Sequence, residues 1–388
     1  MQQQEQIRLL EQARALVTEG RTDLSQPGGE LPVERYTDPQ RFERERRVLF
    51  RRLPLLVGFG SQVRRPGDWF THDLSGVPIL CVRGDDGVLR AFLNVCRHRG
   101  ARLVQSPLDG AGGSEQPVFS CWFHGWTYGN DGALRKLPVP EAFPDLDRAG
   151  CGLVELPCAE RHGLVFAVPT PGVELDIDDY LGPLIAELGS FGLGDYVMTS
   201  PGVQTRRLNW KLHMDATQEV YHLPYLHAET AGAGYFHNCS ILEHRAPHGR
   251  MVMPGPSVKE LDDGARDRWR LLDHAAVVYA LFPNTTLLLH MGYVELLSVF
   301  PVDTDTSKVR TAMLVPGGAV DYQEVFQRKS HLETYLSTME EDLTVCEQMQ
   351  ANMRTGANAA LRLGRAESLL AQFHRTVDRV VDELAARS

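Results

Sequence analysis

Two short stretches decide how this chain folds: NVCRHRGARL, which starts at residue 94, and FSCWFHGWTYGNDGAL, which starts at residue 119. The first places Cys96 two positions before His98, and the second places Cys121 three positions before His124, with 22 residues between the two pairs. A structural zinc site usually groups its ligands by type, as C-x2-4-C followed by H-x3-5-H. Here each stretch carries one thiol and one imidazole, so both Cys can bind one metal ion and both His another.

This sorting of the ligands is the arrangement that a Rieske centre needs, in which two cysteines hold one iron of a [2Fe–2S] cluster and two histidines hold the other. A zinc site and an accidental spacing are the alternatives. The two stretches resemble those of the Rieske domain in the Rieske non-haem iron oxygenases. The resemblance implies that the cluster is bound by Cys96, His98, Cys121 and His124.

Length and composition favour two domains of an ordinary globular protein. The chain has 388 residues, of which 43% are hydrophobic and 23% are charged. A net charge of −10 argues against nucleic acid or an anionic membrane as a partner. The sequence shows no run of ~20 apolar residues and no signal-peptide pattern at its start. We therefore expect a cytoplasmic protein with reduced cysteines.

The patterning predicts an α+β fold that begins with helices and continues into a small β domain. Residues 5–19 have helical periodicity, and Asp38 followed by Pro39 is typical of the start of a second helix. Between residues 46 and 168, short apolar strands alternate with turns such as GDDG and NDG. We expect residues 46–168 to form the Rieske domain, small and antiparallel, and residues 1–45 to pack on the remaining domain.

Residues 169–388 are expected to form a larger catalytic domain, because this half resembles the antiparallel sheet flanked by helices found in the same oxygenases. The runs AVVYALFPNTTLLLH and YVELLSVFPV predict adjacent strands. Two long helical patterns close the chain, near residues 323–353 and 361–384.

A second group of candidate ligands lies in NWKLHMDATQEVYHLPYLH, which starts at residue 209. His222 and His227 are about 140° out of phase on an ideal helix, so both can reach one metal ion only if the helix distorts or ends between them. Pro224 predicts such a break. Two imidazoles and one carboxylate form the facial triad that holds Fe(II) for oxygen activation.

The resemblance implies that His222 and His227 bind the iron and that the third ligand comes from MEEDLTVCEQMQ. The family pattern points to Asp342. Its rivals in this acidic stretch are Glu340, Glu341 and Glu347.

Two further acids are candidate catalytic residues. The resemblance implies that Glu219, three residues before His222, joins this ligand to a Rieske histidine of a neighbouring subunit, here His124. Glu219 can also fix the tautomer of His222 through a hydrogen bond. Asp215 occupies a position that is often Asn in the family, and we expect it beside the substrate pocket.

The implied function is that of a terminal oxygenase, an enzyme that uses O2 to hydroxylate, dihydroxylate or demethylate a small organic substrate. Electrons would come from a ferredoxin or flavin reductase, and NAD(P)H would act only through that partner. A homotrimer is expected, and an aromatic or other hydrophobic substrate is favoured. The alternatives are a quaternary-ammonium or N-methyl monooxygenase of the same family and a Rieske electron carrier without oxygenase activity.

Overall fold

The computed structural model describes residues 1–24, 26–105, 110, 112–318 and 322–386, and it divides into two compact units. The larger unit combines three segments: Met1–Leu49, Ala186–Phe191 and Thr199–Ser388. The smaller unit combines two: Phe50–Ile185 and Gly192–Met198. The smaller unit therefore begins and ends later in the chain than the expected span of residues 46–168.

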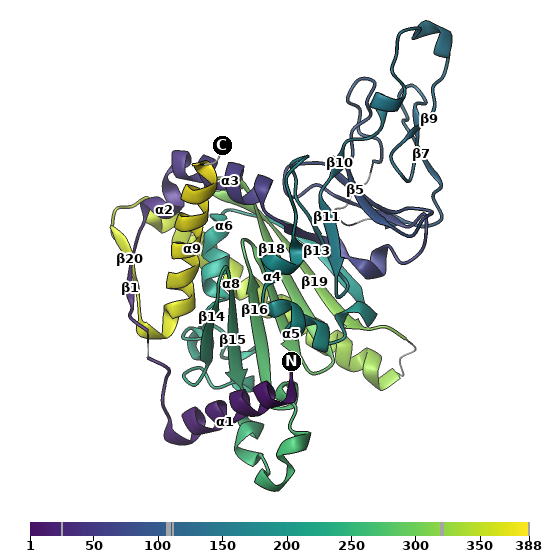
Figure 1. Cartoon of the computed structure of the whole chain (residues 1–388). Coiled ribbons are helices and arrows are strands. Elements are labelled where there is room, and N and C mark those ends of the chain that lie inside the picture. Colours follow the sequence, from purple (N-terminus) through teal and green to yellow (C-terminus); the bar gives the residue numbers. More distant parts are fainter. Residues whose placement is uncertain (25, 106–109, 111, 319–321, 387–388) are drawn as a thin grey trace. The chain divides into compact units, whose positions relative to one another are not determined.

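The smaller unit is built from short antiparallel strands (Figure 1). They form a five-stranded sheet in the order β10-β5-β4-β3-β6 and two three-stranded sheets, β11-β12-β2 and β7-β8-β9. The strands are β2 (Leu55–Phe59), β3 (Trp69–His72), β4 (Ile79–Arg83), β5 (Leu89–Leu93), β6 (Gly112–Gly113), β7 (Val118–Ser120), β8 (Thr127–Gly129), β9 (Leu134–Lys136), β10 (Glu155–Leu156), β11 (Cys158–Arg161) and β12 (Leu164–Ala167). Helix α4 (Ile177–Leu181) follows in this unit, while most of α5 (Leu184–Ser190) belongs to the larger unit.

Both predicted hairpins are confirmed in this unit. The GDDG turn joins β4 to β5, whose last paired residues are Arg83 and Leu89. The NDG turn joins β8 to β9, and Gly132 in it has the positive φ of 81° that glycine accepts without strain. The strands enclose a core that includes Leu80, Phe92 and Trp126.

The larger unit contains a seven-stranded sheet in the order β13-β19-β18-β17-β16-β15-β14. Neighbouring strands from β14 to β19 pair antiparallel. The strands are β13 (Tyr196–Arg206), β14 (Ile241–Arg245), β15 (His248–Pro254), β16 (Ala275–Leu281), β17 (Thr285–His290), β18 (Tyr293–Asp303) and β19 (Thr306–Pro316). The helices are α1 (Gln3–Glu19), α2 (Glu34–Thr37), α3 (Pro39–Arg52), α6 (Trp210–Ala216), α7 (Leu223–Leu226), α8 (Tyr322–Met353) and α9 (Ser368–Ala385).

Three of the four predicted helices, α1, α3 and α8, form near their predicted positions, and local capping signals mark boundaries of α1 and α3. Gly20 ends α1 with a φ of 60°, and the Asp38 carboxylate accepts the Gln40 N–H at the start of α3. The prediction of a last helix from residue 361 is wrong at its start. Residues Ala360–Leu363 form β20, which pairs with β1 (Gly29–Pro32), so α9 begins at Ser368. Pairing with a segment more than 300 residues away is invisible to local periodicity.

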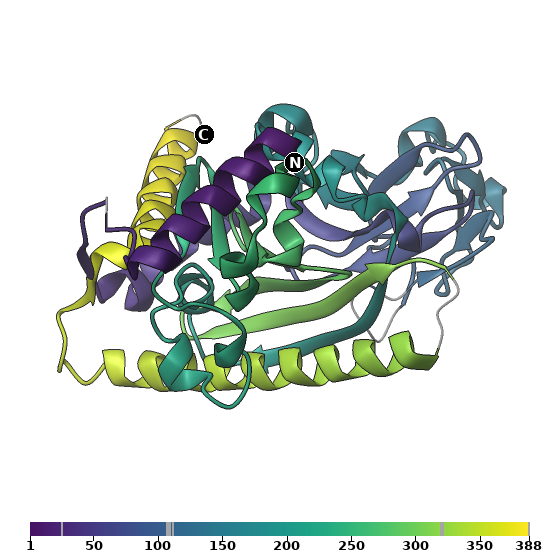
Figure 2. The same cartoon turned by 90° about the horizontal axis from the view of Figure 1, so that it is seen from below.

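Helices cover the sheet of the larger unit, and α8 runs along its full width (Figure 2). The Tyr335 hydroxyl on α8 donates to the Leu296 carbonyl of β18 at 2.5 Å. Helix α1 is held by Arg250 of β15, which is fully buried and lies 2.6 Å from Glu5 and 2.7 Å from Glu187. Among the described residues, every helix is too short or too polar to span a bilayer.

Candidate metal centres

The two Cys/His stretches form loops of the same backbone design. The Cys96 N–H donates to the Ala101 carbonyl, and the Cys96 carbonyl accepts from Gly100. In the second loop, Cys121 makes the equivalent bonds, with the Trp126 carbonyl and the Gly125 N–H. Both glycines have positive φ, 77° and 73°, which lets each loop turn back tightly after its Cys.

The loops separate their ligands by burial. Cys96 and Cys121 are only 2% and 3% exposed, whereas His98 is half-buried and His124 is exposed. The two imidazole centroids lie 4.6 Å apart in an edge-to-face arrangement. Both thiols thus lie inside the unit, and both rings lie toward its surface.

The chemistry of these four groups fits a mixed Cys/His cluster. Nδ1 of His98 is buried without a hydrogen-bond partner, so it is free to bind a metal ion. Burial and the charge of His124 lower the pKa of His98, which favours the neutral, ligating form. Burial also raises the pKa of the Cys96 thiol, so a bound metal ion is the group that would hold it as a thiolate. Tyr128 supports this side of the site, because its hydroxyl lies 3.4 Å from Cys96 Sγ and accepts the Arg97 N–H.

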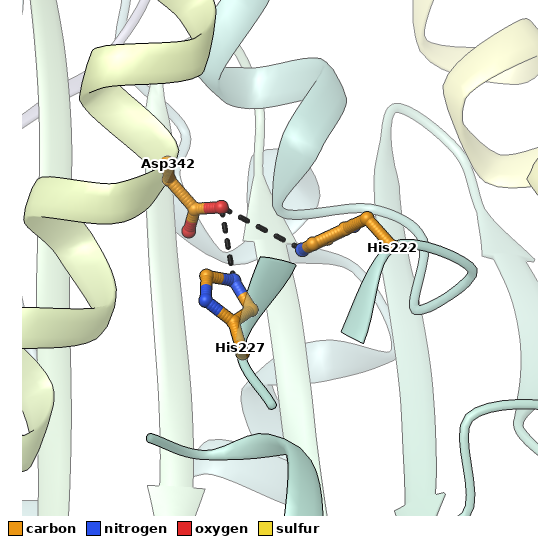
Figure 3. A group of neighbouring side chains, drawn as sticks. All are labelled: His222, His227 and Asp342. Atoms are coloured by element: carbon orange, nitrogen blue, oxygen red, sulfur yellow. Dashed lines mark ion pairs between the residues drawn. The ribbon is translucent and has the colours of Figure 1, made fainter. Parts of the chain in front are cut away.

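His222, His227 and Asp342 converge in the larger unit (Figure 3). Their ligand atoms all lie within 4.8 Å of one another. Asp342 Oδ1 lies 3.0 Å from Nε2 of His227 and 3.6 Å from Nε2 of His222. This oxygen is buried and has no hydrogen bond of good geometry, so it is available to a cation between the two rings.

The local backbone brings the two histidines together in a different way from the prediction. Helix α6 ends at Ala216. The one-turn helix α7 follows, with His222 as its N-cap residue and His227 as its C-cap residue. Pro224 stands in the first turn of α7, where a missing N–H costs nothing, and therefore does not break a longer helix. The two rings lie edge to face with centroids 5.0 Å apart.

A carboxylate stands behind each imidazole. Glu219 contacts Nδ1 of His222 and also accepts hydrogen bonds from the backbone N–H groups of Tyr221 and His222. Its carboxylate therefore stabilises the turn before α7, and Glu219 and His222 do not share the face of a helix. Glu341 lies 2.7 Å from Nδ1 of His227. Each carboxylate fixes the tautomer that turns Nε2 toward Asp342. The partnership of Glu341 with His227 was not predicted from the sequence.

The remaining acids of the distal stretch point elsewhere. Glu340 pairs with Arg206, and Glu347 accepts the backbone N–H of Arg207 at 2.8 Å. Of the four acids considered as the third ligand, only Asp342 directs an oxygen to the space between the two rings. The partners of Glu340 and Glu347, Arg206 and the backbone of Arg207, lie at the end of β13 or directly after it, more than 130 residues earlier in the sequence. The local sequence around the two acids therefore does not predict these contacts.

These carboxylates also change the acid–base properties of the two histidines. Burial acts to lower the pKa of His222, but Glu219 and Asp342 outweigh it and leave the pKa raised. The pKa of His227 is raised in the same way by Asp342 and Glu341 against the effect of burial.

Asp215 is buried but does not line the cavity next to His222 and His227, contrary to the expectation from the sequence. Its carboxylate accepts a hydrogen bond from the Tyr36 hydroxyl at 2.6 Å and lies 2.9 Å from Nε2 of His374. These contacts join α2, α6 and α9. Asp215 is therefore a residue that holds three helices together and not one that touches a ligand in the cavity.

A cavity of about 310 Å³ adjoins the three converging residues. Its walls are the sheet face of β15 to β18, one side of α8 and the turn before α7. Apolar side chains dominate its middle: Val220, Leu223, Met251, Met253, Val278, Leu288, Leu297 and Met339.

Fold and site together define a class of protein with two separate groups of candidate metal ligands, one of mixed Cys/His type and one of two histidines and a carboxylate. A family model for the Rieske [2Fe-2S] domain matches residues 54–156, and one for the ring hydroxylating alpha subunit (catalytic domain) matches residues 194–383. The chain belongs to the family of Rieske oxygenase alpha subunits.

Individual relatives agree with this family. The large oxygenase component of a 2,4-dinitrotoluene dioxygenase system from Burkholderia sp. is 32% identical over 209 residues, 51% of this chain and 44% of that protein. The alignments with the first curated relatives thus span less than half of their length. The putrescine 2-hydroxylase of Bordetella bronchiseptica is 27% identical over 385 residues, 91% of this chain and 85% of that protein.

A solved structure of a quaternary ammonium Rieske monooxygenase has the same fold. It matches with a TM-score of 0.80 at 23% identity and covers 92% of this chain and 96% of that chain.

Proposed function

We propose that this chain is the terminal oxygenase component of a multicomponent system, an enzyme that oxygenates a small organic substrate with O2. The observation that carries the proposal is the convergence of His222, His227 and Asp342 on one point at the wall of a cavity. When bound, a Rieske cluster and an Fe(II) ion supply the electron transfer and the O2 activation. The protein supplies the ligands, their orientation and a site shielded from water.

Cys96, His98, Cys121 and His124 are the proposed ligands of the cluster. The two buried thiols would hold one iron inside the unit, while the two imidazoles would hold the other near the surface. Neutral imidazole in place of thiolate raises the potential of such a cluster to roughly −150 to +300 mV. His124 is exposed, so it is our candidate for the exit of electrons.

His222, His227 and Asp342 are the proposed ligands of the mononuclear Fe(II). These three residues would hold the ion at the cavity wall, where O2 and substrate could approach it. Glu219 and Glu341 would orient the imidazoles, because each contacts the Nδ1 atom that does not face Asp342. The apolar wall of the cavity would keep water away while the substrate is bound.

The assembly we propose is a homotrimer, or a multiple of it, in which the cluster of one subunit supplies the iron of the next. Exposed aromatic side chains support it. Trp122 and Phe123, 65% and 48% exposed, directly precede His124 in the chain. Tyr221 and Tyr225, 64% and 77% exposed, lie on either side of His222 in the chain. Covering both patches in one interface would bring His124 to Glu219 of the next subunit, and Glu219 could then join the two centres.

Mixing two inactive variants tests the proposed electron path. A Cys96→Ser chain would lack the cluster, and a His227→Ala chain would lack the iron. Mixed trimers should regain O2 uptake with a suitable substrate and reductase, because some interfaces then join an intact cluster to an intact iron site. If each variant alone is inactive and mixed trimers stay inactive as well, electrons do not cross between subunits.

The redox partner is proposed to be a ferredoxin or a flavin reductase, with NAD(P)H acting only through it. An aromatic or other hydrophobic compound is the favoured substrate class, since most of the cavity wall is apolar. The second candidate is a quaternary-ammonium or N-methyl substrate. O2 uptake measured across aromatic, alicyclic and N-methyl compounds would separate the classes.

A Rieske electron carrier without oxygenase activity is the least favoured function. Such a carrier has no use for the second group of ligands or for the cavity beside it. Electron transfer without any substrate-dependent O2 uptake would favour the carrier.

A further inference from the structure

Glu295 is a carboxylate in an otherwise apolar row of the cavity wall. Pairing across four strands sets Met251 of β15 opposite Val278 of β16, Val278 opposite Leu288 of β17, and Leu288 opposite Glu295 of β18. All four side chains line the cavity. A carboxylate taken out of water in such a row costs free energy unless it finds a cation or hydrogen-bond donors.

The described residues of the cavity wall do not supply that cation in full. No arginine or lysine is among the described residues that line the cavity. The basic group near Glu295 is His290, whose Nε2 lies 3.5 Å from a Glu295 oxygen, beyond the ~3.2 Å limit of a good N–H···O bond. The other nitrogen of His290 already contacts the Tyr235 hydroxyl at 2.8 Å.

The other acids in the cavity wall are accounted for. Asp342 faces the proposed iron, and Glu219 contacts His222 and two backbone N–H groups. Among the acids of the described cavity wall, Glu295 is thus the one whose negative charge is not balanced by a cation or by hydrogen-bond donors at close distance.

Several aromatic rings of the cavity wall lie near Glu295. Tyr293 stacks on His290 and on His331, both with centroids 4.4 Å apart. Burial and the charge of Glu295 both raise the pKa of Tyr235, of Tyr293 and of Tyr335, so all three rings are within its electrostatic reach and remain neutral phenols. Aromatic faces beside a carboxylate are the means by which proteins bind organic ammonium ions. The two imidazoles cover the faces of Tyr293, so the rings left for such an ion are those of Tyr235 and Tyr335, which also line the cavity.

The position of Glu295 relative to Asp342 sets the direction in which a ligand would lie in the cavity. His331, Tyr335, Met339 and Asp342 follow one another at helical spacing along α8, and all line the cavity. Asp342 lies eleven positions after His331 in α8, a rise of about 16 Å at 1.5 Å per residue. His331 is exposed, so the Glu295 end lies toward the surface and the Asp342 end lies inside.

We infer that this cavity binds a small organic cation, an amine or quaternary ammonium compound, with its charged nitrogen beside Glu295 and its carbon chain directed to His222, His227 and Asp342. The cation would stay near water, which lowers its desolvation cost, while its apolar part fills the middle of the cavity. The inference rests on the proposed oxygenase function and, within it, favours the second candidate substrate class, amines and quaternary ammonium compounds, over an aromatic one. It names Glu295 as the residue that determines specificity and places oxidation on carbon away from the charged group.

Ligand pairs that differ only in charge test this inference. Choline and hydroxybutyl-trimethylammonium would each be compared with an uncharged isostere in which carbon replaces the nitrogen. Binding would be measured without O2 by isothermal titration calorimetry on the iron-loaded protein. We expect the longer cation to bind at least about tenfold more tightly than its isostere, a preference that Glu295→Gln should reduce to about twofold.

Two further variants serve as controls. Glu295→Asp keeps the charge and should keep the preference for the cation, while Leu288→Met changes the facing apolar residue and should affect cation and isostere alike. Equal affinity of the wild-type protein for cation and isostere would overturn the inference without contradicting an oxygenase function. A chain that holds no iron would contradict the oxygenase function instead, whatever the ligand preference.

Discussion

Glu341 lies 2.7 Å from Nδ1 of His227, while the next residue, Asp342, faces Nε2 of the same ring at 3.0 Å. Two consecutive residues of α8 therefore hold opposite edges of one imidazole. The Thr230 hydroxyl donates to the same Glu341 oxygen at 2.8 Å and fixes its position. Asp342 is therefore the candidate metal ligand, while Glu341 orients the ring of His227.

Replacing Glu341 with alanine should weaken iron binding by about 10- to 100-fold, because the imidazole loses the partner that fixes its tautomer and orientation. The Kd for Fe(II), or for Co(II) as a probe, would be measured without O2. Glu340→Ala is the matched control, since this neighbour pairs with Arg206 and not with a histidine. Equal affinities in the two variants would contradict the role of Glu341.

Glu219→Ala is expected to keep both metal centres but to slow coupled turnover strongly. The ligands remain, while the carboxylate that could join His222 to the cluster of the next subunit is lost. Iron content, the spectrum of the cluster and the rate of O2 uptake would be compared. If turnover is unchanged, Glu219 only holds the local turn.

Metal affinity should rise with pH. The pKa values of His222 and His227 lie above the ordinary value near 6.5 in the metal-free protein, since nearby carboxylates favour the protonated rings. Below those pKa values, protons compete with the metal, and binding must release them. The Kd for Co(II) should therefore fall steadily between about pH 6 and about pH 8. A Kd that is independent of pH would mean that both rings are already neutral.

The buried pair of Glu45 and Lys211 should dominate the local stability around α6. Both side chains are at most 1% exposed, and Lys211 Nζ lies 2.5 Å from Glu45 Oε2. Burial lowers the pKa of Lys211 and Glu45 opposes this. Glu45→Gln would leave a buried amine without its charge partner and should cost about 3–5 kcal/mol of unfolding free energy.

Lys211→Met should cost less than Glu45→Gln, because Arg41 still lies 2.8 Å from Glu45. The double variant should recover part of the loss seen in Glu45→Gln. Chemical unfolding of the three variants would measure these differences. Strictly additive losses would show that the two groups do not interact.

The sequence predicted well those features that depend on neighbouring residues. The Cys96 and Cys121 loops, the two hairpin turns and helices α1, α3 and α8 all follow from spacing, capping or periodicity. His222 and His227 were predicted from one stretch to meet at one point, and their side chains do converge, although the turn that brings them together differs from the predicted helix break. Their binding of iron stays a prediction.

Features that depend on distant pairing could not be predicted. The strand at residues 360–363 exists because β1 pairs with it, and Asp215 turns away from the cavity because Tyr36 and His374 satisfy its carboxylate. The same applies to Glu295, whose setting appears only when four strands are in register. No local pattern around these residues carries that information.

The most direct test of the central claim is the metal content of the purified chain. We predict about three iron atoms per chain with about two acid-labile sulfides, a brown colour and a reduced-state EPR signal of the mixed Cys/His type. His227→Ala should retain about two iron atoms and the same EPR signal. Zinc without visible absorption, or a wild-type chain that holds no more iron than His227→Ala, would contradict this account.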